Sequence, residues 1–271
     1  YVVNISGANN ALNVNAAPVT VSVQLDGETL SENGNNVYSY NAAERVISLT
    51  YNGIVDGDDL SVAETITIGF ENASAYAVAN SISAVGKYVV SVYVITDERN
   101  YYISGKGASS FNTLDINVEI AKAELSVSVD ALPETSFEKV YGSADPDFSA
   151  YADGVNGETV AVTFVRTPGE SVGKYSFVSV NVGTEFAENY NAVLINSEKA
   201  FAVTPAQISA DPDVLLADRL TKTYGEADPD FSAYADGVNG ESVAVTFVRA
   251  SGENAGEYQI ASVTTENGNY T

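Results

Sequence analysis

Three Asp-Pro-Asp triplets are the residues of this sequence best suited to bind a metal ion. Two carboxylates on one turn supply oxygen ligands, which calcium prefers. Alternatively, Asp favours the entry to a turn and Pro fixes φ before the strand that follows. No segment has the spacing of an EF-hand loop, and both interpretations stay open. The candidate calcium ligands are Asp145, Asp147, Asp228 and Asp230, with Asp153, Glu158, Asp236 and Glu241 as further ligands and Asp211-Pro212-Asp213 as a third triplet.

Two arginines, Arg166 and Arg249, precede Glu170 and Glu253 by four residues across a turn. We expect each pair to brace a hairpin, which stabilises it by at most about 1 kcal/mol if the pair is exposed. The alternative role is contact with an anion.

The 17 tyrosines could stack against sugars. Tyr175 and Tyr258 alternate with Phe177 and Ile260, which instead predicts packing toward a core.

Enzymatic chemistry has little support in this composition. The chain has no Cys, His, Met or Trp, so it lacks the thiol nucleophile, the imidazole base and every disulfide. Paired carboxylates could act as in glycosidases, but such a pair requires one specially tuned cleft, and here every acidic candidate recurs. Lys139 and Lys222 are expected to be solvated beside their Tyr-Gly turns, the alternative being a Lys–Asn isopeptide bond. We therefore predict a non-enzymatic protein without a cofactor, calcium excepted.

The charge of the chain limits its partners. With 12 Lys+Arg against 36 Asp+Glu, the net charge is -24, which repels phosphate backbones and anionic lipids. Neither nucleic acid nor the membrane is an expected partner, and no run of 18 apolar residues occurs. Since the chain begins at Tyr1 and has no Met, we expect a fragment of a larger protein.

An internal repeat organises the sequence. Residues 222–249 repeat residues 139–166 with three differences, at Val140/Thr223, Ser143/Glu226 and Thr159/Ser242. A third, divergent copy shares Val-Asp-Gly-Asp at 55–58, Val-Gly-Lys-Tyr at 85–88 and Asn100-Tyr101. Its longer segments, 69–83 and 103–115, are expected to form loops. The predicted division is a terminal hairpin of a preceding module (1–16), a divergent module (17–122), a second module (123–205), and a third that lacks its C-terminal hairpin (206–271).

Local patterns within each predicted module favour strands. Val160, Val162 and Phe164 alternate with Ala161, Thr163 and Val165, and dipeptides such as Asn156-Gly157 and Asn239-Gly240 accept positive φ. Roughly seven short strands in 80 to 100 residues predict tandem all-β, immunoglobulin-like sandwiches in an elongated array. A β-grasp-like module is the alternative.

The repeated signature resembles the MBG-type repeat. It comprises Lys139-Val140-Tyr141-Gly142, Asp145-Pro146, Gly154 to Glu158, Arg166, Gly169-Glu170, Gly173, Tyr175 and Asn189-Tyr190, and it recurs from Lys222 to Tyr270. The resemblance implies modules that occur in tandem in large bacterial surface proteins, including mucus-binding-type adhesins, and supplies no catalytic residues.

The resemblance and the repeat together lead to one expected function. We expect an extracellular fragment of a bacterial cell-surface or secreted protein that acts as adhesive or spacer modules. Glycans or glycoproteins and neighbouring modules are the expected partners. The alternative is an accessory region of a secreted polysaccharide-degrading enzyme, which calcium could rigidify.

Overall fold

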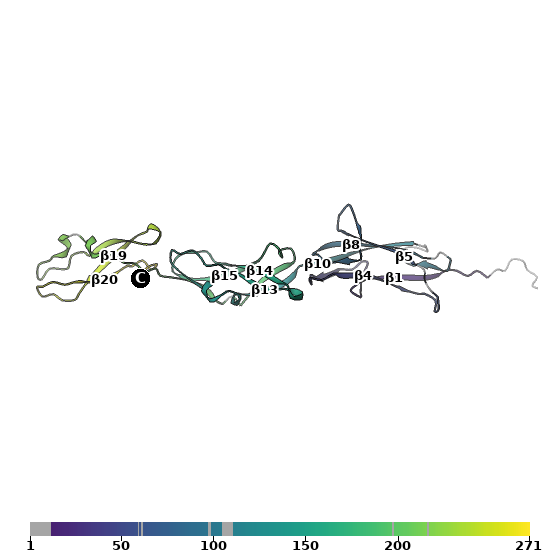
Figure 1. Ribbon diagram of the computed structural model, residues 1–271, viewed down its shortest axis with the longest axis horizontal. Coiled ribbons are helices and arrows are strands. Elements are labelled where there is room, and N and C mark those ends of the chain that lie inside the picture. The colour runs from purple at the N-terminus through teal and green to yellow at the C-terminus, as the bar shows by residue number, and fades with distance from the viewer. Residues whose placement is uncertain are drawn as a thin grey trace, which may run out of the picture. The chain divides into compact units, whose positions relative to one another are not determined.

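Strands make up the regular structure because apolar and polar residues alternate along most of the chain. The structure is a computed structural model that describes residues 12–58, 60, 62–96, 99–104, 111–196, 198–215 and 217–271. These residues form sheets joined by turns and short 3-10 helices, without an α-helix among them (Figure 1). The predicted all-β sandwich class is confirmed.

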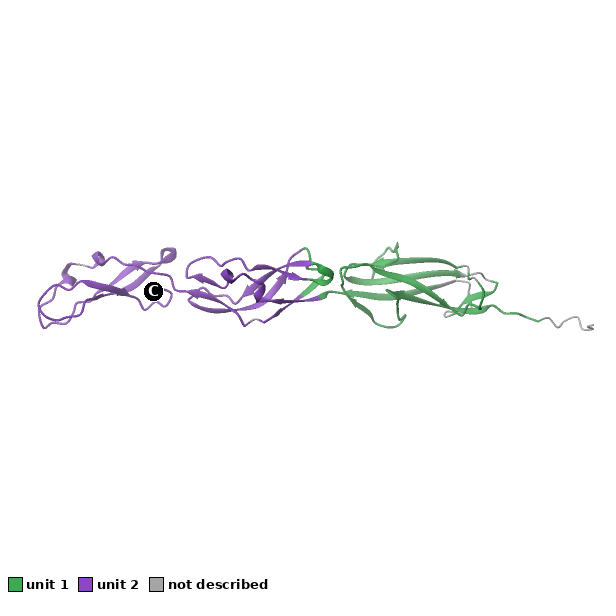
Figure 2. Cartoon of the chain, turned by 60° about the horizontal axis from the view of Figure 1, so that its bottom comes forward, with its two compact units in different colours: residues 1–123, 154–158, 185–191 green, residues 124–153, 159–184, 192–271 purple. Residues whose placement is uncertain are grey.

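The chain divides into two compact units, coloured separately in Figure 2. The first unit consists of Tyr1–Ala123, Gly154–Glu158 and Glu185–Asn191. The second unit consists of Glu124–Asp153, Thr159–Thr184 and Ala192–Thr271. Two short loops of the second predicted module, 154–158 and 185–191, therefore group with the residues that precede that module.

The first unit contains two sheets, each with one parallel pair among antiparallel ones. One sheet has the order β2-β1-β4-β7, and β9 pairs in parallel with β1. Its strands are β1 (Ala17–Leu25), β2 (Glu28–Thr29), β4 (Arg45–Asn52), β7 (Ser81–Ile82) and β9 (Tyr101–Ile103).

The other sheet of the first unit has the order β3-β10-β8-β5-β6, with β3 parallel to β10. Its strands are β3 (Asn36–Ser39), β5 (Val62–Phe70), β6 (Ala77–Val78), β8 (Gly86–Thr96) and β10 (Phe111–Ala121). The expected loops at 69–83 and 103–115 are partly wrong, because these segments include β6, β7 and the start of β10 and their alternation allows pairing. Residues 105–110 lie outside the described residues.

The second unit contains a five-stranded sheet with the order β12-β17-β15-β14-β13 and a three-stranded sheet with the order β18-β19-β20. Strands β11 and β16 form a two-stranded sheet. The strands are β11 (Ala123–Ser128), β12 (Glu138–Val140), β13 (Ser149–Asp153), β14 (Thr159–Arg166), β15 (Gly173–Val182), β16 (Tyr190–Ile195), β17 (Ala200–Thr204), β18 (Ser232–Asp236), β19 (Ser242–Arg249) and β20 (Ile260–Thr264).

Six 3-10 helices lie between the strands in the part of the chain that the structure describes. Two of them contain the repeated Asn-Gly dipeptide, and Asn156 and Gly157 adopt φ values of 51° and 80° as predicted. This turn ends immediately before Glu158, whose carboxylate is used below. The helices are η1 (Val129–Ala131), η2 (Glu134–Ser136), η3 (Val155–Gly157), η4 (Pro212–Val214), η5 (Ala217–Leu220) and η6 (Val238–Gly240).

The core follows the alternation in sequence. On β14, Val160, Val162 and Phe164 are buried while their neighbours face outward, as predicted. The equivalent strand β19 buries Val243, Val245 and Phe247. No helix among the described residues is both long enough and apolar enough to cross a bilayer.

Candidate functional site

Strand β14 places a charged residue on its buried face. The alternation that buries Val160, Val162 and Phe164 continues by two residues to Arg166, whose side chain is only 7% exposed. An arginine held in the interior requires partners for its guanidinium donors. Those partners come from two other segments of the second unit, the turn at Asp145 and residues 167–170.

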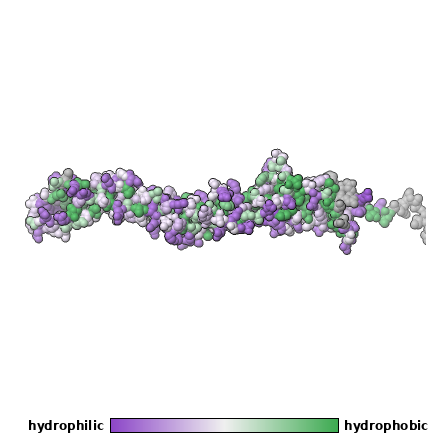
Figure 3. Space-filling model, in the orientation of Figure 1, coloured by the Kyte–Doolittle hydropathy of each residue, from purple (hydrophilic) through white to green (hydrophobic). Residues whose placement is uncertain are grey.

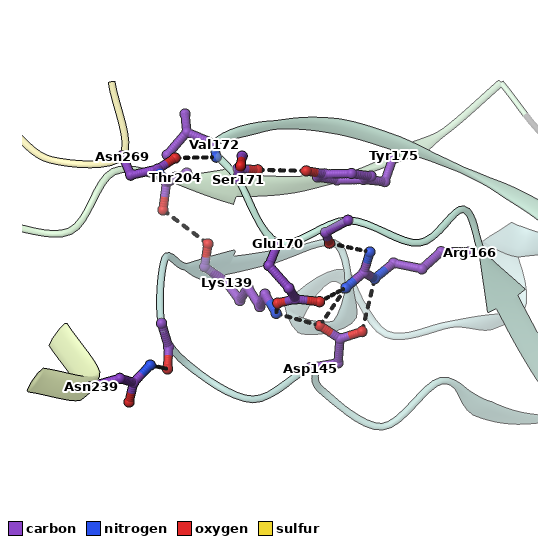
Figure 4. A network of polar contacts seen from close by, with 12 residues as sticks. Lys139, Asp145, Arg166, Glu170, Ser171, Val172, Tyr175, Thr204, Asn239 and Asn269 are labelled. Atoms are coloured by element: carbon purple, nitrogen blue, oxygen red, sulfur yellow. Dashed lines mark hydrogen bonds and ion pairs between the residues drawn. The ribbon is translucent and has the colours of Figure 1, made fainter. Parts of the chain in front are cut away.

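Carboxylates from two segments bind the Arg166 guanidinium (Figure 4). Asp145 accepts two hydrogen bonds, from Nε at 2.8 Å and from Nη2 at 2.9 Å. Glu170 accepts from Nη2 at 2.8 Å. Nη1 donates to the backbone carbonyls of Thr167 at 2.9 Å and Gly169 at 2.7 Å. The predicted Arg166–Glu170 pair is confirmed, but it is one part of a larger and more buried cluster.

Lys139 completes this cluster. Its ammonium lies 2.7 Å from Asp145 and also donates to Glu170. Burial opposes the charged form of Lys139, but the two carboxylates outweigh that effect and its pKa is raised. The expectation that Lys139 is solvated is wrong, because its side chain is 4% exposed. We call Lys139, Asp145, Arg166 and Glu170 the charged cluster of the second module.

Two aromatic rings lie against the Arg166 guanidinium. Tyr175 and Phe201 each lie 5.0 Å, ring centroid to guanidinium carbon, from it. Gly169 has a φ of 148°, and a Cβ there would lie 2.2 Å from the Tyr175 ring. Glycine therefore allows the turn to present its carbonyl to Arg166 beneath Tyr175.

Position for position, the third predicted module repeats this arrangement. Lys222 lies 2.7 Å from Asp228 and 2.6 Å from Glu253. Arg249 binds the same two carboxylates at 2.9 and 2.5 Å, and Tyr258 lies 5.0 Å from its guanidinium. These contacts, Arg249 before Lys222, lower the pKa of Asp228 to about 2. We call Lys222, Asp228, Arg249 and Glu253 the charged cluster of the third module.

The predicted calcium ligands take different positions from one another. Asp145 and Asp228 belong to the charged clusters, where each carboxylate already faces two cations. Asp147 and Asp230 each accept a hydrogen bond at 2.9 Å from the backbone two residues later, at Ser149 and Ser232.

The third triplet has the turn geometry of the structural alternative, with the Asp211 carboxylate accepting from the Asp213 amide. Among the described residues, no group of three or more acidic side chains is arranged to hold a metal ion. Calcium binding at Asp145 would have to break two ion pairs, and it stays a prediction.

A second repeated contact joins tyrosines to a carboxylate. In the first unit, Tyr40 donates to one oxygen of Glu158 at 2.9 Å, and Tyr190 donates to the other. The Tyr190 oxygen also accepts from the Val155 amide at 2.9 Å. The rings of Tyr40 and Tyr190 pack edge to face at 5.6 Å. Burial, and then the Glu158 contact, raise the pKa of Tyr190 to about 12.

The second unit contains the same contact. Tyr141 and Tyr270 donate to the two oxygens of Glu241, each at 2.6 Å, and their rings lie 5.5 Å apart. Both hydrogen bonds lower the pKa of Glu241. We call Tyr40–Glu158–Tyr190 and Tyr141–Glu241–Tyr270 the tyrosine triads. Glu158 and Glu241, predicted as further calcium ligands, are thus acceptors for tyrosine.

The first predicted module contains a tyrosine and a carboxylate that contact each other as two members of a triad do. Tyr101 donates to Asp58 at 2.5 Å and accepts from the Val55 amide at 3.1 Å. These contacts match those of Tyr190 with Glu158 and Val155.

Sequence reasoning missed both the triads and the burial of the cluster. The signal for Arg166 was present, since it continues the spacing of Val160, Val162 and Phe164 by two. The signal for the triads was the recurrence of Tyr141, Glu158 and Tyr190, but nothing in the spacing shows that Tyr40 contacts Glu158, 118 positions later.

Comparison with known proteins agrees with the repeat. Residues 135–198 and 214–271 match the family model described as MBG domain (YGX type). These two matches confirm the resemblance seen in the sequence. The family is one of non-catalytic repeat modules of surface proteins.

Other comparisons add little. No curated protein matches the chain. A solved structure of SGBP-B from the Bacteroides ovatus mixed-linkage glucan utilization locus, in complex with a mixed-linkage heptasaccharide, is similar at 12% identity with a TM-score of 0.22. The alignment covers 90% of this chain and 60% of that one.

Proposed function

We propose that this chain is a non-enzymatic repeat region of a bacterial cell-surface protein and that its modules act outside the cell as spacers. One observation carries the proposal: the side chains that recur between copies bind one another. Lysine, aspartate, arginine and glutamate form the charged clusters, and tyrosine and glutamate form the triads. The repeated residues thus make contacts with other residues of the chain. This is expected of a repeat protein in which the number of modules sets the length of the protein.

The proposed module boundaries share one backbone contact. The amides of Ala17, Ala123 and Ala206 donate to the carbonyls of Asn100, Asn189 and Asn269 at 2.7, 2.9 and 2.9 Å. Each acceptor precedes the tyrosine that pairs with Asp58, Glu158 or Glu241. We therefore propose modules at 17–122, 123–205 and 206–271, with residues 1–16 belonging to a preceding one. In each triad, Tyr40 or Tyr141 of one module contacts the acidic residue of the next.

Small-angle scattering tests the spacer role. We expect the chain to be extended in solution, with a radius of gyration well above that of a compact chain of its length, about 18 Å. Replacing Tyr40 and Tyr141 by Phe removes both tyrosine contacts to the following carboxylates and should broaden the distribution of distances. Tyr224→Phe is the matched control, since Tyr224 is 72% exposed. A compact wild-type chain would contradict the proposal.

Adhesion to glycans is a second candidate function, favoured by two exposed tyrosines. Tyr151 on β13 and Tyr234 on β18 occupy equivalent positions on edge strands and are 71% and 69% exposed. Exposed rings of this kind stack on sugars. Figure 3 shows hydrophobic residues among hydrophilic ones on the face in view, so any such platform would be local.

Binding of the chain to immobilised mucin and to a glycan array, measured in calcium and in chelator, distinguishes an adhesive role from a spacer role. Saturable retention would support adhesion if the double variant Tyr151→Ala with Tyr234→Ala abolishes it and the control Tyr224→Ala leaves it intact. No retention in either buffer would leave the spacer role alone.

Two further alternatives have their own tests. An accessory region of a secreted polysaccharide-degrading enzyme predicts a catalytic domain in flanking sequence, whereas a surface protein predicts an anchor and more copies. Rigidification by calcium predicts a higher melting temperature in calcium than in chelator. Equal melting curves would exclude calcium binding at Asp145, Asp147, Asp228 and Asp230.

A further inference from the structure

A row of residues crosses the outer face of the sheet β3-β10-β8-β5-β6 in the first predicted module. On β8 and β10, Val90 and Val118 are buried and face the core. Successive residues of a strand point to opposite sides, so Val89 and Asn117, which pair with each other, lie on the outer face. Gly69 on β5 pairs with Val89 and belongs to the same row. The row therefore runs over three strands.

The Tyr76 ring lies over one end of this row. A Cβ on Gly69 would lie 2.7 Å from the ring, so glycine allows the ring to lie against β5. Tyr76 belongs to the connection between β5 and β6 and is 44% exposed. The outer face of the sheet thus carries an aromatic ring that is open to solvent and held against the strand beneath it.

A hollow of about 160 Å³ begins at the other end of the row. Its polar lining residues are Asn117, Asn35 before β3, Glu71, Lys87 and Glu119. The Lys87 side chain is 63% exposed and its ammonium lies 3.8 Å from Glu119. Among the described residues, the side-chain amides of Asn35 and Asn117 have no hydrogen-bond partner. Neighbouring strands lie about 4.8 Å apart, so the strands beneath the ring and the Asn117 amide are about 10 Å apart.

The second module has alanine where the first has two of these polar groups. The lysine of the shared Val-Gly-Lys-Tyr motif pairs with Glu119 on β10 and with Ala202 on β17. Two residues before each, β10 has Asn117 where β17 has Ala200. Because β14 leads to β15 through a single turn, Tyr76 has no counterpart among the described residues of the second module. The ring and the hollow thus distinguish the divergent module from the repeated one.

We propose that the divergent module binds one uncharged sugar residue of a glycan on this face, between the Tyr76 ring and the hollow. A sugar has an apolar face of C–H groups, which stacks on an aromatic ring, and hydroxyls that donate and accept hydrogen bonds. The amides of Asn35 and Asn117 offer both donors and acceptors, Lys87 offers donors, and the two carboxylates accept. The proposal rests on the adhesive candidate function, not on the spacer role, and places the sugar away from the edge-strand tyrosines.

The charge and the size of the hollow select the kind of sugar. Lys87 contributes one positive charge and Glu71 and Glu119 two negative ones, in a chain with a net charge of -24. This charge disfavours sialylated, sulfated and uronic sugars. The hollow is smaller than the roughly 300 to 1,000 Å³ of a pocket that encloses a drug-sized ligand. It therefore accepts one sugar residue and leaves the rest of the glycan in solvent.

Binding of the whole chain to immobilised oligosaccharides tests the site. The probes end in glucose, galactose, mannose or N-acetylglucosamine, and sialylated and sulfated oligosaccharides are measured beside them. We expect retention on a neutral probe, with a Kd that Tyr76→Ala and Asn117→Ala each raise at least tenfold. Val46→Ala is the matched control, since Val46 is 49% exposed on the other sheet of the same module, and it should leave the Kd within about twofold.

Tyr76→Trp reports on stacking without removing the ring. The chain has no tryptophan, so the fluorescence of this variant comes from the site, and we expect it to change as the neutral probe saturates. Unchanged fluorescence during binding, or retention of anionic probes alone, would overturn the proposal. Loss of binding in Tyr151→Ala with Tyr234→Ala but not in Tyr76→Ala would overturn this site and keep adhesion. No retention on any probe would overturn both and leave the spacer role untouched.

Discussion

The charged clusters of the second and third modules contain the same four residue types at nearly the same distances, yet they differ in exposure. Lys139 is 4% exposed and Lys222 is 21% exposed, while Arg166 and Arg249 are 7% and 13% exposed. In the second module, Phe201 of β17 lies against the Arg166 guanidinium, whereas no strand of the described residues takes that place in the third. The comparison teaches that the ion pairs form from the repeated segment itself, whereas their burial depends on a strand from outside it.

Removing Phe201 should have the largest effect, because it makes the second module resemble the third. Phe201→Ala deletes a side chain that is 0% exposed, and we expect a loss of roughly 3 to 5 kcal/mol in the free energy of unfolding of that module. Val193→Ala, at a residue 42% exposed, should change stability by less than about 0.5 kcal/mol. Denaturant unfolding measures both, and a loss below about 1 kcal/mol at Phe201 would remove the basis of the comparison.

Replacing the arginine of a charged cluster should lower the free energy of unfolding more in the second module, where β17 covers the cluster, than in the third. Arg166→Met leaves Lys139 and Asp145 in a largely buried setting, which costs roughly 2 to 3 kcal/mol, at the low end for buried pairs because Glu170 is 66% exposed. Arg249→Met removes the same contacts from a more exposed cluster and should cost less. Equal losses in the two denaturant transitions would show that cover by β17 is unimportant.

Acid should weaken both clusters in a defined range. Arg166 and Lys139 hold the pKa of Asp145 below its usual range, and Arg249 and Lys222 lower that of Asp228 to about 2. Because the folded-state pKa lies below the unfolded value of about 3.9, the stabilisation is present above about pH 4 and is lost as pH falls toward about 2. Unfolding midpoints measured across this range should fall, and less steeply for Asp228→Asn. An unchanged slope would contradict the assignment.

The tyrosine triads should give a smaller effect at alkaline pH. The pKa of Tyr190 is raised to about 12, so its contribution is present below about pH 10 and is lost as pH rises toward 12. Tyr190→Phe should cost about 1 kcal/mol at neutral pH and remove one late-titrating phenol from the ultraviolet titration. If Tyr190 titrates near pH 10, the triad does not form in solution.

Much of the fold could be predicted from local pattern. Alternation identified β14 and its buried face, and the Asn-Gly turn of η3 was recognised from its dipeptide. The charged clusters and the tyrosine triads could not be predicted in this way. Their contacts join residues that lie far apart in the sequence, such as Tyr40 and Glu158 or Lys139 and Glu170. Lys139 was expected to be solvated because it lies beside a Tyr-Gly turn, but a charged residue can be buried where two carboxylates contact it.

Hydrogen exchange tests the central claim most directly, because it reports protection residue by residue. We predict that amides 139–141 and 173–176, in the segments that pair with β17, exchange slowly and that the equivalent amides 222–224 and 256–259, which form no strand, exchange fast. Equal protection in the two sets would contradict the account.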